Sequence, residues 1–130
     1  MSDSENSYLE FCSDGLHFLL PLFWVESIKD EKEVTDELFL MDFCKFIGGE
    51  KAGTGRYIII LRREEIRFGI LVEEVIGIRE ILEQKFIDLP PVVLNKDNQY
   101  LKSVFYQKDL KEEDTLAYLL EPQYLTVEKE

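Results

Sequence analysis

Histidine and cysteine are scarce in this sequence, which has one histidine and two cysteines among 130 residues. His17 stands beside Phe18 in an apolar stretch, and no serine, cysteine or acidic motif accompanies it. A catalytic base or nucleophile is therefore not predicted. One histidine and two widely spaced cysteines, Cys12 and Cys44, also do not form a zinc-binding pattern. The sequence predicts a protein that is not an enzyme and uses no cofactor or metal, with both cysteines as buried thiols.

Long apolar runs and excess positive charge are also lacking. No stretch approaches the roughly 20 apolar residues that span a bilayer, and the polar, acidic first seven residues do not resemble a signal peptide. We therefore expect a cytoplasmic protein without membrane insertion. The 27 acidic and 15 basic residues give a net charge of −12, which repels nucleic acids and anionic lipid headgroups. The same charge favours basic partner surfaces.

Glycine is concentrated in one segment, residues 48–55, which lacks the features of a phosphate-binding loop. Such a loop has a lysine directly after its last glycine and then a helix. Here Thr54 follows Gly53, and a strand-like segment follows the last glycine. We interpret residues 48–55 as a linker between two halves of the chain.

One pattern is present twice, fifty positions apart. Residues 16–28 and 66–78 share the same order of apolar positions. The identical pairs are Phe18 and Phe68, Val25 and Val75, and Ile28 and Ile78. Self-similarity at a fixed offset indicates that one supersecondary unit was used twice, which predicts two similar small β subdomains. Chance similarity between two apolar strands is the alternative, because β patterns carry little information.

Short extended segments separated by turns fill both halves of the chain. The predicted strands are residues 8–12, 16–22, 23–29, 57–61, 66–75, 78–82, 86–91, 100–106 and 115–120, with a short apolar run at 38–43. Pro21 is expected to end its strand or to lie at an edge, and Gly77 to mark a bulge or bend. Only short helical segments are expected, at 44–47 and 121–127, and residues 1–6 are expected to form a disordered tail. Nine or ten short strands predict an all-β fold built from barrels.

Phe23 and Trp24 are adjacent large aromatic residues. A strand cannot bury two adjacent side chains on one face, so one of them is a candidate contact residue. The alternative is that loops or the other subdomain cover both.

Three pieces of the second half resemble the CheW-like domain family, the adaptor module of bacterial chemotaxis arrays. Residues 56–78 are similar to the family's strand, glycine and Val-Asp-x-Val pattern. Residues 81–91 are similar to the stretch that ends in consecutive prolines, and residues 100–125 to the closing strands. In the first half, Tyr8–Phe11 and Phe18–Leu22 resemble the opening hairpin.

The resemblance implies a single domain over residues 1–130, made of two small SH3-like five-stranded β-barrels related by a pseudo-twofold axis. The subdomains would span residues 8–50 and 56–127, with strands exchanged between them. Only nine residues separate Ile28 from Leu38, where the family carries a proline-containing loop and an Asn-Leu-Arg-Gly strand. The strand and its arginine are therefore missing, which leaves open whether the first barrel is complete.

The resemblance also implies a function, namely non-enzymatic coupling of chemoreceptor tips to the regulatory domain of a CheA-type histidine kinase. By position, Val25, Ser27 and Ile28 fall at the receptor groove, with Leu125 as its far wall. The residues near the kinase face are Leu38, Phe39, Leu40 and Met41. The family's glutamate is displaced by one position, so that Ser27 stands in its place.

A repurposed module that binds one partner or itself, and that competes with a full adaptor, is the alternative. The shortened first barrel could expose a strand edge that pairs with another chain or is covered in a homodimer.

Overall fold

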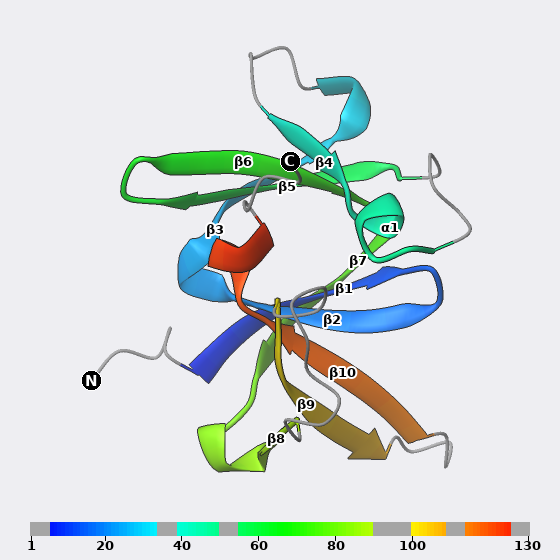
Figure 1. Cartoon of the computed structure of the whole chain (residues 1–130), viewed down its shortest axis with the longest axis vertical. Helices are drawn as coiled ribbons and strands as arrows, with labels where there is room; N and C mark the ends of the chain where they lie inside the picture. Colours follow the sequence, from blue (N-terminus) through cyan, green and yellow to red (C-terminus); the bar gives the residue numbers. More distant parts are fainter. Residues whose placement is uncertain (1–5, 34–38, 50–54, 90–99, 109–113, 126–130) are drawn as a thin grey trace.

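Ten strands in two sheets make up most of the computed structural model (Figure 1), which describes residues 6–33, 39–49, 55–89, 100–108 and 114–125. The six-stranded sheet has the order β7 (Glu74–Glu80), β1 (Ser7–Ser13), β2 (Leu16–Pro21), β10 (Asp114–Leu120), β9 (Leu101–Lys108), β8 (Phe86–Asp88). The four-stranded sheet has the order β3 (Val25–Asp30), β5 (Tyr57–Arg63), β6 (Ile66–Val72), β4 (Leu40–Asp42). The helical segments are α1 (Phe43–Phe46) and the 3-10 turns η2 (Leu22–Trp24), η3 (Glu31–Glu33), η4 (Glu83–Lys85) and η6 (Pro122–Leu125).

The internal repeat is visible in the strand register. In the β1–β2 hairpin Phe11 lies opposite Phe18, and in the β5–β6 hairpin Leu61 lies opposite Phe68, so both members of each pair are shifted by fifty positions. The turns match as well, because Asp14 and Glu64 both have a φ of 56°. These coincidences extend over whole ladders, which confirms the duplicated unit.

Each unit gives its third strand to the other sheet. After β2 the chain crosses to the four-stranded sheet, where β3 pairs with β5; after β6 it crosses to the six-stranded sheet, where β7 pairs with β1. Both ladders skip one residue at the same place in the repeat, Glu26 in β3 and Ile76 in β7. Gly77, which follows the skipped residue, has a φ of 150°. The bulge expected at Gly77 is therefore present, and it has a counterpart in β3.

The main hydrophobic core lies between the two sheets and draws on both hairpins. Phe43 at the start of α1 meets the ring of Phe11 at 5.1 Å and that of Phe18 at 4.8 Å, both edge to face. Asp42 caps α1, because its side chain accepts a hydrogen bond from the Lys45 backbone N–H. The buried members of this core are Leu9, Phe11, Phe18, Leu20, Trp24, Phe43, Ile59, Leu61, Phe68, Ile70, Val72, Leu120 and Leu125.

The four-stranded sheet is the shorter version of the six-stranded one. β4 runs parallel to β6 just as β10 runs parallel to β2. Beyond β10 lie β9 and β8, whereas among the residues described here β4 pairs with β6 alone. Residues 31–39 join β3 to β4, whereas residues 81–113 join β7 to β10. The all-β, two-sheet architecture is confirmed, with the described strands distributed as six and four rather than as five and five.

Some expectations differ from the structure or fall outside the described residues. Residues 23–29 are not continuously extended, because η2 precedes β3 and turns the chain between the sheets. β2 ends at Pro21, as expected. Each sheet contains strands from both ranges 8–50 and 56–127, and the division into subdomains with those limits stays a prediction. Most of the expected tail and of the expected linker lies outside the described residues. Within the described part of the chain, no helix is long and apolar enough to cross a membrane.

Candidate partner-binding surfaces

Strand β3, the edge strand of the four-stranded sheet among the described strands, carries three of the predicted contact residues. Ile28 lies opposite the buried Ile59 but is itself 42% exposed. Val25 and Ser27 are half-buried. The repeat places Ile78 at the matching position of β7, where it is also exposed. Sequence reasoning did not select Ile78 as a contact residue, although the fifty-residue offset from Ile28 could have identified it.

Glu26, the residue skipped in the β3 ladder, is engaged within the protein. Its two carboxylate oxygens accept hydrogen bonds from Nε and Nη2 of Arg67, both at 3.0 Å. Arg62 Nη1 lies 4.0 Å away. The hydrogen bond from Arg67 lowers the pKa of the Glu26 carboxyl, and the charges of Arg67 and Arg62 add to the effect. Glu26 is therefore held in a forked ion pair beside Ser27.

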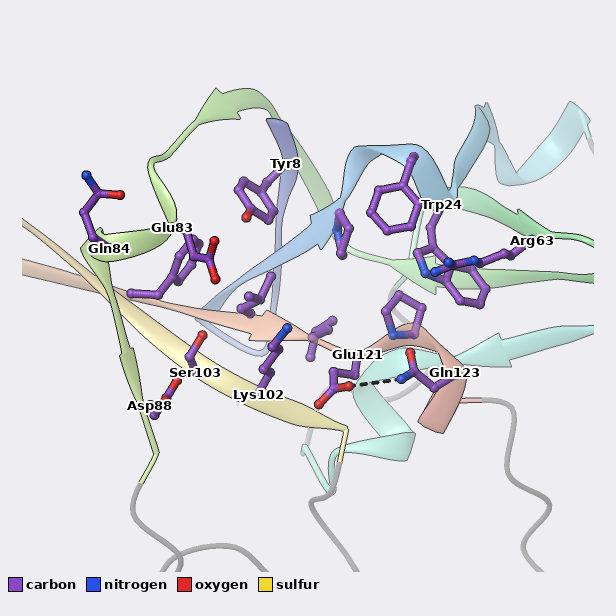
Figure 2. Close-up of a pocket in the computed structure, with 16 residues that line it drawn as sticks. Tyr8, Trp24, Arg63, Glu83, Gln84, Asp88, Lys102, Ser103, Glu121 and Gln123 are labelled. Atoms are coloured by element: carbon purple, nitrogen blue, oxygen red, sulfur yellow. Dashed lines mark hydrogen bonds between the residues drawn. The ribbon is translucent and has the colours of Figure 1, made fainter. Parts of the chain in front are cut away.

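A pocket of about 750 Å³ opens next to the start of β3 (Figure 2). Phe23 and Trp24, which directly precede Val25, line it on one side, and Pro122 and Gln123 of η6 line it on another. Trp24 is buried, and Phe23 is 52% exposed. Of the two adjacent aromatic residues, Phe23 is therefore the one available for contact.

The prediction that Leu125 forms the far wall of the groove needs correction. Its side chain is 2% exposed and belongs to the main core. η6 places it inward, whereas Pro122 and Gln123 of the same turn reach the pocket. The C-terminal turn thus borders the hollow through neighbours of the predicted residue.

Charged side chains lie at opposite ends of the pocket. Arg63 lies beside Trp24 at one end, and Glu83 and Asp88 lie at the other (Figure 2). Burial raises the pKa of Tyr8, and the nearby charge of Glu83 raises it further. Lys102, which also lines the pocket, lies next to Ser103, the partner of Asp88 in the β8–β9 ladder. The Arg63 end of the pocket is therefore cationic, whereas the other end carries charges of both signs.

A second candidate surface is the outer edge of β4. Phe39 and Leu40 are exposed, and Met41 is half-buried. The backbone carbonyl of Phe39 accepts a hydrogen bond of 2.8 Å from the Gly69 N–H, which ties this segment to β6. Leu38, the fourth residue predicted here, lies outside the described residues. Since no other described strand pairs with the outer edge of β4, the exposed apolar side chains make this a surface that another chain could cover.

Comparison with known proteins identifies the family. A family model described as "CheW-like domain" matches residues 36–130, well over half of the chain. The chain belongs to the CheW-like domain family. None of the curated proteins matches it. A similar solved structure is the scaffolding protein TtCheW from Thermoanaerobacter tengcongensis, with a TM-score of 0.75 and 17% sequence identity over 96% of this chain and 90% of that one.

A polar cluster of this CheW-like domain lies on the six-stranded sheet, away from the two surfaces. The Glu10 carboxylate accepts a hydrogen bond of 2.9 Å from Arg79 Nη1 and lies 2.6 Å from His17 Nδ1. His17 is half-buried. Cys12, which lies 3.5 Å from the His17 ring, is also half-buried, whereas Cys44 is buried. Burial and nearby carboxylates raise the pKa of Cys12 to about 11, so its thiol is protonated at neutral pH and is a poor nucleophile.

Proposed function

We propose that this CheW-like protein is a non-enzymatic adaptor that couples chemoreceptors to the regulatory domain of a CheA-type histidine kinase. The observation that carries the proposal is the pocket lined by Phe23 and Trp24, which directly precede β3, together with a separate exposed edge at β4. Two surfaces on one small domain allow two partners to be held together, so that their effective concentration rises. We place this activity in the cytoplasm, where receptor arrays would recruit the protein to the membrane.

Receptor binding is assigned to the pocket and the adjoining edge of β3. The pocket has a volume typical of ligand sites. Phe23 is exposed and lines the pocket, and Ile28, which follows in β3, is also exposed. A helical receptor tip would bury these apolar side chains.

Kinase binding is assigned to the β4 edge. Phe39 and Leu40 are exposed there, and Met41 is half-buried. Apolar side chains at an open strand edge are suited to contact with a second β-rich domain. This assignment extends the sequence prediction for residues 38–41.

The second candidate is a repurposed module that binds one partner or itself. Two observations favour it. The four-stranded sheet has no described counterpart of β9 and β8, and Glu26 is occupied by Arg67 instead of standing free beside Ser27. In this case the β4 edges of two copies would pair in a homodimer.

Calorimetric titration of the purified protein with the kinase regulatory domain, and separately with a receptor cytoplasmic tip from the same cell, distinguishes the candidates. The adaptor hypothesis expects both to bind. Binding of one partner alone supports the repurposed module, and binding of neither contradicts the signalling role.

Matched variants assign each surface. Ile28→Lys should weaken receptor binding, whereas Leu16→Lys should not, because Leu16 is exposed to the same extent (43%) on the distal end of β2. Leu40→Lys should weaken kinase binding, whereas Leu116→Lys, at 46% exposure compared with 44%, should not. Equal effects of the members of either pair would contradict the assignment of that surface.

A further inference from the structure

Among the described residues, Arg63 has no carboxylate partner, although the protein is acidic. The chain has 27 acidic and 15 basic residues, and the described ion pairs use Arg62, Arg67, Arg79 and His17. Within the described residues, Arg63 forms none. Its side chain instead lines the pocket.

Two aromatic rings hold the Arg63 guanidinium in place. Its central carbon lies 5.0 Å from the centroid of the Phe23 ring and 5.7 Å from that of Trp24. Both distances are within the range of cation–π attraction. No ion pair of the described residues uses the Arg63 guanidinium, so its N–H donors are available for the fork geometry that pairs with a carboxylate.

The surroundings favour an anionic group at this end of the pocket. Glu83 and Asp88 lie at the far end (Figure 2). Glu121, another carboxylate of the lining, accepts a hydrogen bond of 3.0 Å from Gln123. Lys102 lies near Asp88 in the lining, so that the far end carries both signs of charge. A negatively charged group of a ligand would therefore be matched most directly at the Arg63 end.

We infer that Arg63 is a partner-binding residue that pairs with a carboxylate of the receptor segment entering the pocket. The inference rests on the proposed function, because it names one recognition contact within the receptor surface. Phe23 and Trp24 act as positioning residues, since they fix the guanidinium before the partner arrives. The cost of ordering a long arginine side chain is then small at the moment of binding.

The test is the affinity of Arg63 variants for the receptor tip, measured by calorimetry at several salt concentrations. Arg63→Ala should weaken binding by about tenfold, the size of a typical interface arginine contact, and should flatten the salt dependence of the affinity. Arg63→Lys should also bind more weakly, because an ammonium lacks the planar fork. Arg62→Ala is the matched control: it alters the adjacent residue, which points to the opposite sheet face toward Glu26.

The outcomes separate this inference from the proposed function. If the wild-type protein binds the receptor tip and Arg63→Ala binds it with the same affinity and the same salt dependence, the role of Arg63 is wrong and the adaptor function stands. Wild-type protein that does not bind the tip overturns the receptor role and the inference with it. If sedimentation shows a wild-type dimer that Arg63→Ala dissociates, without loss of receptor affinity, the pocket serves a second copy of this chain and the inference is wrong. Equal urea midpoints for the variants exclude a folding defect.

Discussion

The buried carboxylate of Glu10 offers a direct test of how the two halves of the repeat are held together. Glu10 lies on β1, His17 on β2 and Arg79 on β7, so the cluster joins three neighbouring strands of the six-stranded sheet. Glu10→Gln keeps the shape of the side chain and removes its charge. The variant therefore tests whether the charge on a nearly buried side chain stabilises this sheet.

The expected loss follows from the two contacts of this carboxylate. A hydrogen bond to a charged group contributes about 1.5–3 kcal/mol, and glutamine retains one neutral acceptor, so about one such contribution is lost. Arg79 and His17 are each about one-third exposed, so water can solvate them after the change. We expect a destabilisation of about 2 kcal/mol. With a urea dependence of about 1.5 kcal/mol per molar, the unfolding midpoint should fall by about 1.3 M.

The repeat provides the control. Arg67 stands fifty positions after His17 and also holds a carboxylate, that of Glu26. The Glu10 side chain is 5% exposed and that of Glu26 is 32% exposed, so Glu26→Gln should shift the midpoint much less, because exposed pairs are screened by water. Equal shifts for the two variants, or no shift for Glu10→Gln, would refute the reasoning.

Three further predictions concern the core, the bulge and the thiol. Phe43→Ala should destabilise the protein by about 3–5 kcal/mol and lower its melting temperature by more than about 10 °C in calorimetric scans, because Phe43 is fully buried against the rings of Phe11 and Phe18. A smaller fall would mean that α1 does not close the core. Gly77→Ala should cost about 1–3 kcal/mol in urea unfolding through its φ of 150° alone, since a Cβ there would meet no atom within 4 Å. Cys12, with its pKa raised to about 11, should react with iodoacetamide in native protein far more slowly at pH 8 than a free thiol does. The reaction rate should keep rising with pH above 9. A plateau of the rate near pH 9 would contradict the raised pKa.

The sequence predicts the strands of this fold better than their partners. Alternation places Leu9 and Phe11 on one face of β1, and both are core residues. The repeat predicts two equivalent units, and the register bears this out. The alternation of apolar and polar residues determines which face of a strand a side chain occupies, but it does not determine which strand pairs with that strand. The pairing of β3 with β5 and of β7 with β1 therefore does not follow from the sequence pattern.

The candidate site was less predictable than the fold. Leu22, Phe23 and Trp24 form an apolar run without a period, so the 3-10 turn that buries Trp24 and exposes Phe23 has no sequence signal. Arg63 looks like part of a polar hairpin turn in the sequence, and only the folded chain brings it to the rings of Phe23 and Trp24. Sites built from distant segments need the tertiary structure, because no spacing rule connects their residues.

The central claim is that one molecule holds a receptor and a kinase at two separate surfaces. Size-exclusion chromatography with light scattering, applied to a mixture of the protein, the kinase regulatory domain and a receptor cytoplasmic tip, tests it most directly. The account predicts one complex that contains all three components, that loses the receptor in Ile28→Lys and that loses the kinase in Leu40→Lys. A mixture in which the two partners displace each other, so that only binary complexes form, would contradict the account.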